Sequence, residues 1–312
     1  MRSKNQSTEL MQLGFGGHES FPLRHGWLKK GFDVVRGNAV ALSTDEAMTQ
    51  LGVGKNMLSA IRHWGLACAV FKDAENGRGI EPSTFGMALL AENGWDPFLE
   101  DVGSIWLLHW KLTWAKEIAA AWNWVFKRPR GNRFSKDLVV LELQEQARIS
   151  RGRVSPDTIK RDVDVFVRSY VRKAAKHNHT SDEALESPFT ALGLVRPAAN
   201  DAEFELVQGV HPSLPLAIFQ AALWEYAKRD DTLHRSISLD ELMYGPNSPG
   251  RVFRLSEEGL ILRLHQLQML RPDSYAVDET AGLRQLLLKG DPIDENQILN
   301  DYYKLTSRAV SK

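Results

Sequence analysis

The sequence of 312 residues contains one cysteine and carries no net charge. Because Cys68 is alone, an internal disulfide is excluded and a reducing, cytoplasmic environment is expected. Lys and Arg number 39, as do Asp and Glu, which argues against a histone-like protein that coats DNA. The length and the hydrophobic content of 43% are ordinary for a folded protein of two or three domains.

Long apolar runs are also missing. Residues 1–6 are polar, so we expect no signal peptide. The stretch that most resembles a membrane span, residues 102–126, contains His109, Lys111 and Glu117 and is unsuited to a bilayer. The sequence therefore predicts a soluble cytoplasmic protein that has no membrane partner.

Several catalytic signatures are absent. No Asp-x-Lys or Glu-x-Lys triplet occurs, so the common core of metal-dependent nucleases is not present. Residues 52–55 (GVGK) resemble the end of a phosphate-binding P-loop, but Thr49 stands where its first glycine belongs, and no nucleotide cofactor is expected. Residues 177–179 (HNH) lack the spacing of the nuclease motif with these letters, and His18 has no partners at zinc-site spacing.

Residues 16–31 (GGHESFPLRHGWLKKG) are the most informative segment. They place polar and charged side chains between glycines, which let a backbone approach a partner closely. Histidine and glutamate can move the protons of phosphodiester cleavage, while arginine or a metal ion can stabilise the charge. We therefore take His18, Glu19 and Arg24 as candidate catalytic residues, with His18 as proton carrier. Glu19 would act as base or as the ligand of a divalent metal ion, Mg²⁺ or Mn²⁺.

The same segment has a purely structural interpretation, and composition alone favours it. In this alternative the segment is a capped turn in which Glu19 pairs with Arg24. Its apolar side chains would then enter the core: Phe21, Leu23, Trp27 and Leu28.

A helix-turn-helix pattern follows. Ser43 and Glu46 have the spacing of a capping box, the turn is Gly-rich at residues 52–54, and a second helix is predicted from residue 55 to 64, with Gly65 as its stop. An apolar run, a polar tip and Ile80 then predict the two strands of a wing. The outer face of the second helix would meet DNA through Lys55, Asn56, Ser59, Arg62 and His63. Alternatively, this pair of helices serves only packing or protein contacts.

The middle of the chain is basic. Residues 96–126 predict one Trp-rich connecting helix, whose Trp106, Trp110 and Trp114 are expected in the core. Residues 127–177 hold fourteen Lys and Arg against six Asp and Glu. A basic loop and two helices, the second capped by Ser155, would form a second helix-turn-helix. Solvated helix faces are the alternative. The cations expected to contact phosphates are Lys29, Lys30, Lys127, Arg128, Arg130, Arg133, Lys160 and Arg161.

The predicted fold class is mainly α with small β wings, in which multiple winged-helix or helix-turn-helix units are joined by helices. Its parts are an N-terminal winged helix (1–95), the connecting helix (96–126), a helical domain with the basic loop (127–235) and a C-terminal winged-helix-like unit (236–312). In the last part, Ser238 caps a helix and one long helix is expected over 251–270. Its acidic tail favours protein contacts over DNA contacts.

Four segments carry a family resemblance. Residues 17–30, with the letters GHESFPLR and GWLKK, and residues 95–110, with WDPFLED and WLLHW, are the more specific ones. Residues 160–164 and 248–253 follow in order and are weak alone. The chain resembles a family of bacterial proteins encoded beside DNA phosphorothioation genes, which includes SspB-type DNA nickases. Ser20 stands where the family commonly has threonine and keeps the hydroxyl.

The resemblance implies a nickase that opens one DNA strand for sulfur incorporation, in a system that modifies DNA and defends against phage. It implies double-stranded DNA, a cysteine desulfurase, an ATPase and an ATP-activating sulfurtransferase as partners, and it leaves a homodimer open. The alternatives are a non-catalytic adaptor that recruits the sulfur-transfer complex, or a winged-helix transcriptional regulator. The resemblance assigns no catalytic residue, so the candidates above rest on the chemistry of their side chains.

Overall fold

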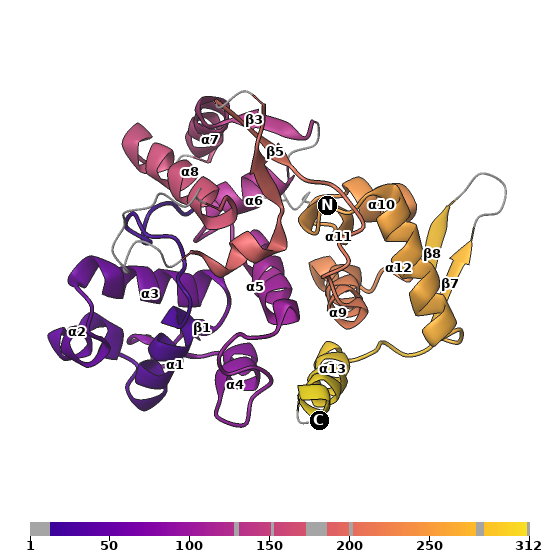
Figure 1. Ribbon diagram of the computed structural model, residues 1–312, viewed down its shortest axis with the longest axis horizontal. Coiled ribbons are helices and arrows are strands. Elements are labelled where there is room, and N and C mark those ends of the chain that lie inside the picture. Colours follow the sequence, from indigo (N-terminus) through magenta and orange to yellow (C-terminus); the bar gives the residue numbers. More distant parts are fainter. Residues whose placement is uncertain are drawn as a thin grey trace, which may run out of the picture.

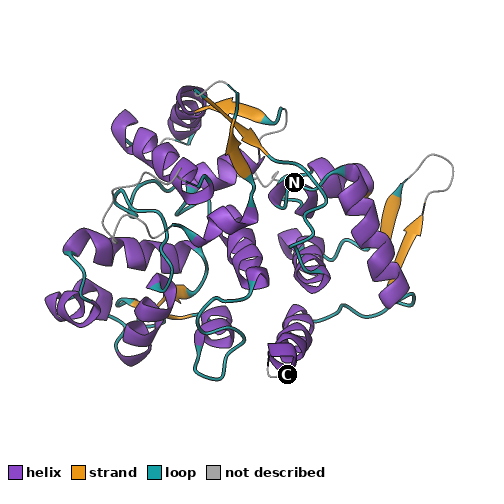
Figure 2. Cartoon of the chain, viewed as in Figure 1, coloured by secondary structure: helices purple, strands orange, loops and turns teal. Residues whose placement is uncertain are grey.

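A computed structural model describes residues 13–127, 131–150, 153–172, 186–199, 202–278 and 284–310. These residues form many short helices and three small sheets (Figures 1 and 2). The expectation of a mainly helical protein with small β elements is therefore confirmed. Arg128 and Arg130, two predicted phosphate contacts, lie outside the described residues.

The N-terminal part contains the predicted order of two helices and a hairpin. Its elements are α1 (Trp27–Gly37), η1 (Ala41–Ser43), α2 (Asp45–Leu51), α3 (Lys55–Ala67), the antiparallel pair β1 (Phe71–Asp73) and β2 (Ile80–Pro82), and α4 (Thr84–Leu90). Two details differ from expectation. Thr44, not Ser43, caps α2, because its side chain accepts the Ala47 amide. Gly65 lies inside α3, where a Cβ would come within 2.0 Å of the Phe71 ring.

The single connecting helix is replaced by two, α5 (Val102–Trp114) and α6 (Ala120–Lys127). The break has a physical cause, since the N-terminal segment enters it. The Gly14 amide donates to the Lys116 carbonyl oxygen at 3.0 Å, and the Gly14 carbonyl accepts from the Ala120 amide at 3.0 Å. Trp106 and Trp110 are fully buried and Trp114 is partly buried against the core, so their core role is confirmed.

The rest of the chain repeats one arrangement: a strand, then helices, then a hairpin whose last strand lies in the centre of the sheet. The first copy comprises β3 (Arg133–Ser135), α7 (Lys136–Ile149), α8 (Pro156–Tyr170), η2 (Pro188–Leu192), β4 (Val195–Pro197) and β5 (Glu203–Leu206), with sheet order β3-β5-β4. The second comprises β6 (Ser236–Ser238), α10 (Leu239–Tyr244), α11 (Pro249–Val252), α12 (Glu257–Leu270), β7 (Tyr275–Asp278) and β8 (Gln285–Leu288), with sheet order β6-β8-β7. The long helix expected over 251–270 is interrupted because Ser256 caps α12 anew.

The C-terminal half also includes α9 (Leu216–Ala227), η3 (Arg229–Asp231) and α13 (Glu295–Val310), and α13 packs against α9. In Figure 1, α5 lies between the N-terminal helices and this half. Residues 95–110, the second motif of the family resemblance, connect the N-terminal helices to the C-terminal half. The Trp95 indole donates to the Asn300 side chain at 2.7 Å, and the Tyr302 hydroxyl donates to the Asp101 carboxylate at 2.8 Å. Over the described residues, the structure contains no helix with the length and apolar character needed to cross a membrane.

Candidate functional site

The first motif is anchored by a buried pair of side chains. His18 and Asp162 are both fully buried, and Nε2 of His18 lies 3.0 Å from Oδ1 of Asp162. The same carboxylate accepts the Gly16 amide at 3.0 Å. Asp162 belongs to α8, so the buried pair fastens the glycine-rich segment to that helix. A buried carboxylate requires such partners, because leaving it unpaired in the core is costly.

Aromatic and imidazole rings surround His18 and complete its enclosure. His63 meets it edge to face with ring centroids 5.1 Å apart, Trp64 stacks on it at 6.1 Å, and Trp122 lies at 5.7 Å. His18 was expected to carry a proton at the DNA. The geometry does not agree with that role, because its ring is enclosed and Nε2 is engaged with Asp162. Its evident contribution is to hold the motif in place.

His63 also departs from expectation. It lies on the polar face of α3 but is 7% exposed, because the segment around Gly17 covers it. Burial, reinforced by repulsion from His18, lowers the pKa of His63 to about 3. His63 is therefore neutral at pH 7 and is not placed for the DNA contact that the helix pattern predicted.

Glu19 occupies the surface end of the motif. Its backbone is left-handed, with φ of 56°, a conformation that residues other than glycine adopt at a cost. The side chain is half-buried, and within the described part of the chain its carboxylate has no hydrogen-bond or ion-pair partner. The pairing with Arg24 in the structural alternative is not formed. Glu19 is thus available to a ligand.

Among the described residues, aromatic rings and not an acid contact the Arg24 side chain. Its guanidinium lies 5.5 Å from the centroid of Phe21 and 5.3 Å from that of Trp27. The apolar half of the structural alternative is correct, since Leu23, Trp27 and Leu28 are buried and Phe21 is partly buried against the core. Stacking leaves the donor groups of a guanidinium free for phosphate oxygens.

The side chains of α3 that were predicted to contact DNA differ in their exposure to solvent. On α3, Lys55 and Asn56 are exposed, and Ser59 and Arg62 are half-buried. The N-cap of α3 is Gly54, which offers no side chain, and no acid occupies the first turn. The first amides of a helix attract anions, and Lys55 adds a positive charge there. This end of α3 suits a phosphate.

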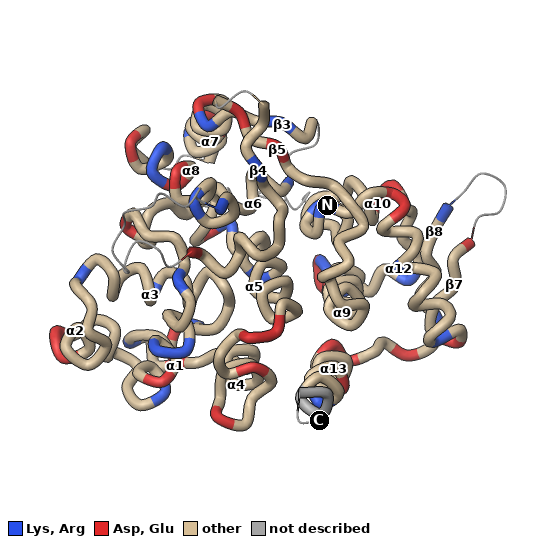
Figure 3. The backbone as a smooth tube through the Cα atoms, viewed as in Figure 1, with Lys and Arg blue, Asp and Glu red and all other residues tan. Residues whose placement is uncertain are grey.

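Other predicted cations lie on α1, on α8 and near the basic loop, and Figure 3 shows Lys and Arg along α1 and α8. Lys30, Arg133, Lys160 and Arg161 are exposed. Lys29 already forms an ion pair, because its ammonium lies 2.6 Å from the Asp33 carboxylate. Lys127 is half-buried. The structure thus presents most of these cations to solvent without bringing all of them to one point.

Two residues that matter to the site were missed in the sequence. Asp162 lies in a basic helix, and its signals were its place among the core-spaced positions of that helix and within residues 160–164 of the family resemblance. Arg168 on the same helix donates to the Ser20 carbonyl oxygen at 2.6 Å, and burial lowers the pKa of its guanidinium. Arg168 therefore places a second cation beside the motif.

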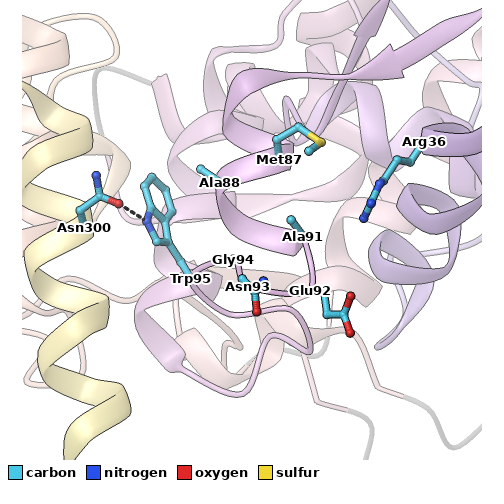
Figure 4. Close-up of a pocket in the computed structure, with 9 residues that line it drawn as sticks. All are labelled: Arg36, Met87, Ala88, Ala91, Glu92, Asn93, Gly94, Trp95 and Asn300. Carbon is cyan, nitrogen blue, oxygen red and sulfur yellow. Dashed lines mark hydrogen bonds between the residues drawn. The ribbon is translucent and has the colours of Figure 1, made fainter.

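A shallow cavity of about 360 Å³ lies elsewhere, between α1, α4 and α13 (Figure 4). Arg36, Trp95 and Asn300 are among the residues that line it, and none of the predicted site residues does. Over the described residues, no group of three or more His, Cys, Asp or Glu is placed to hold a metal ion. Within the described part of the chain, the candidate site is therefore the surface around Glu19, without a cage of metal-ligating side chains.

Comparison of the sequence with family models and of the fold with solved structures leads to the same family. The family model "Protein of unknown function (DUF4007)" matches residues 15–303. A magnesium ion-bound crystal structure of SspB has a TM-score of 0.82 and 32% identity, over 93% of this chain and 88% of that one. Another SspB crystal structure has the same TM-score and identity, over 95% and 90% of the two chains. No curated protein gives a significant match to the sequence. The chain therefore belongs to the DUF4007 family and is similar in sequence and fold to SspB.

Proposed function

We propose that the protein binds double-stranded DNA and nicks one strand during phosphorothioation. The observation that carries this proposal is the position of Glu19. Its carboxylate, which has no hydrogen-bond or ion-pair partner among the described residues, extends from a strained backbone directly beside the buried His18–Asp162 anchor. Backbone strain of this kind collects at functional sites. The similarity to SspB, at 32% identity over most of both chains, supports the same interpretation.

The catalytic role proposed for each side chain depends on whether that side chain can contact the DNA. Glu19 takes the proton of a water molecule whose oxygen forms a bond to phosphorus, or it binds a divalent ion. The bond from phosphorus to a sugar oxygen breaks, and solvent water protonates that oxygen. Arg24 neutralises the phosphate. His18 and Asp162 are positioning residues, because they reach the DNA only through the segment that they hold.

A magnesium ion would fit the donors present. Mg²⁺ keeps several waters and binds through one or two carboxylates together with substrate phosphates. Glu19 supplies one such carboxylate, and the DNA would supply the phosphate oxygens. When bound, the ion would stabilise negative charge on the phosphodiester.

DNA binding would use the helix–turn–helix and hairpin of α2, α3, β1 and β2 as a winged helix. Lys55 and Asn56 at the start of α3 would enter the major groove, with Ser59 and Arg62 behind them. Lys30, Arg133, Lys160 and Arg161 would contact phosphates. The two later strand–helix–hairpin copies would be further winged-helix-like units, and the desulfurase, ATPase and sulfurtransferase partners would act on the nicked DNA.

A nicking assay tests the proposal. Supercoiled plasmid is incubated with wild type, Glu19→Gln and Arg24→Ala, with Mg²⁺, with Mn²⁺ and with a chelator. We expect open-circle product from wild type, and its loss from both variants while they still bind DNA. Glu258→Gln is the matched control, since Glu258 is an exposed carboxylate on α12. Equal nicking by Glu19→Gln and wild type would remove the catalytic assignment. If wild type nicks DNA in chelator while Glu19→Gln does not, Glu19 acts as base and not as a metal ligand.

The adaptor is the second candidate, and the burial of His18 favours it. With His18 enclosed, the motif has lost its nominated proton carrier at the surface. An adaptor would bind DNA with a strong salt dependence yet leave the plasmid supercoiled under all metal conditions.

A further inference from the structure

Three cations that form no ion pair with any described residue lie where the end of α6 meets α11. They are Lys127, Arg251 and Arg254, and Asn132 lies beside them. The Arg251 guanidinium donates to the Lys127 carbonyl oxygen, and Nη2 of Arg254 donates to Oδ1 of Asn132 at 2.6 Å. Among the residues that the structure describes, none of the three cations forms an ion pair. The folded chain therefore holds like charges together through neutral oxygens.

This arrangement is unfavourable as it stands. Burial, together with repulsion from Lys116 and Arg251, lowers the pKa of Lys127. Burial and repulsion from Arg251 lower the pKa of Arg254 to about 10. Charges withdrawn from water are normally paired, because an uncompensated charge destabilises the fold.

Arg254 shows two further signs of a built site. It is only 8% exposed, and its Nε is buried with no hydrogen-bond partner in the described structure. Its backbone is left-handed, with φ of 51°. A strained backbone and a buried guanidinium nitrogen without a hydrogen bond both lower the stability of the fold, so a purely structural role does not explain Arg254. The neighbouring Asn132 is exposed and Lys127 and Arg251 are half-buried, so a ligand can reach the group from solvent.

We propose that Lys127, Arg251, Arg254 and Asn132 bind a phosphate group of the DNA strand. A phosphate would supply the negative charge that the three cations lack, and its oxygens match the forked donors of arginine. The proposal rests on the DNA-binding function above and extends it. It gives the C-terminal half, for which the acidic tail predicted protein contacts, a direct hold on DNA. It also gives a use to residues 248–253, a motif that the nicking site does not employ.

The salt dependence of DNA binding tests this site, since each phosphate contact contributes about 0.9 to the slope of log K against log salt. The variant is Lys127→Met, which removes the ammonium and keeps the carbonyl that Arg251 uses. We expect a slope smaller by about 0.9 and weaker binding, with a Tm without DNA that is equal or higher, because a repulsion is relieved. Lys127→Arg should restore the slope.

The matched control is Arg196→Met, which removes an exposed cation already paired with Glu205 on the neighbouring strand. Its slope should equal that of wild type. An unchanged slope in Lys127→Met, with DNA still bound, would overturn this site and leave the nicking proposal standing. Absence of DNA binding by wild type would overturn both. If inorganic phosphate raises the Tm of wild type but not of Lys127→Met, and their DNA slopes agree, the group binds a small anion and the DNA assignment is wrong.

Discussion

Trp95 stacks on Tyr303 with ring centroids 5.4 Å apart and ring planes 8° apart, although about two-thirds of the chain separates them in sequence. The same contact region includes the bond from the Trp95 indole to Asn300 and a bond of 2.8 Å between the hydroxyls of Ser104 and Tyr303. Residues 95–104 therefore form, together with α9, the surface on which α13 docks.

Removing the Trp95 ring should release α13. We expect Trp95→Ala to lower the free energy of unfolding by about 3 kcal/mol, because a large partly buried ring and its stacking are lost. Tyr303→Phe, which loses only the hydroxyl bond, should cost about 1 kcal/mol. Urea unfolding measures both. Phe98→Ala, at a ring that is 69% exposed, is the control and should change stability by less than about 0.5 kcal/mol. Equal stability of Trp95→Ala and the control would contradict the docking role.

Gly17 and Gly26 separate two effects of glycine in the first motif. Both have positive φ, 76° and 77°, but a Cβ on Gly17 would lie 2.7 Å from Nδ1 of His63, whereas Gly26 faces open space. Gly26→Ala should cost about 1 kcal/mol, the penalty of the left-handed backbone alone. Gly17→Ala should cost clearly more and disturb the Glu19 segment. The comparison is made by thermal unfolding. Similar losses in the two variants would mean that the contact with His63 is not tight.

Asp162 and Asp164 form a second matched pair on α8. Asp162 is fully buried against His18, while Asp164 is 41% exposed and pairs with Lys136 at 2.7 Å. Asp162→Ala should lower stability by about 3 kcal/mol, because the Gly16 amide and His18 lose their acceptor in the core. Asp164→Ala should cost less than about 1 kcal/mol, since exposed pairs contribute little. Chemical denaturation distinguishes them, and a larger loss at Asp164 would refute the anchor.

Local signals predicted local structure well. The Ser155 cap, the Pro156 start and the apolar spacing of α8 identified that helix and its buried face, and Lys160 and Arg161 are exposed as expected. The order of α2, α3 and the hairpin was likewise readable from Gly-rich turns and periodicity. Such features depend on a few neighbouring residues, which the sequence displays directly.

The remaining features depend on contacts between distant segments. The break between α5 and α6 exists because Gly14 inserts its backbone there. His63 lies on the outward face of α3 by periodicity, yet it is buried because the segment around Gly17 folds over it. Asp162 gains its partner His18 from 144 positions away. The periodicity of a helix does not show which distant segment will cover a residue. The sequence could therefore identify the polar residues of the first motif as candidates, but it could not show which are buried to hold the motif and which are exposed.

The buried histidines make stability depend on pH in a defined direction. Burial lowers the pKa of His63 to about 3 and that of His109 to about 4, below the ordinary value of 6.5. Between pH 6.5 and the lowered pKa values, the unfolded chain binds more protons than the folded chain. The free energy of unfolding is therefore highest above about pH 6.5 and decreases as the pH falls toward 4. Each histidine contributes a slope of up to about 1.4 kcal/mol per pH unit. Urea titrations from pH 7.5 to 4.5 should show this decline. His63→Asn should flatten it, and His265→Asn, at an exposed site, should not. The same decline in His63→Asn as in wild type would show that this imidazole is not buried in its neutral form.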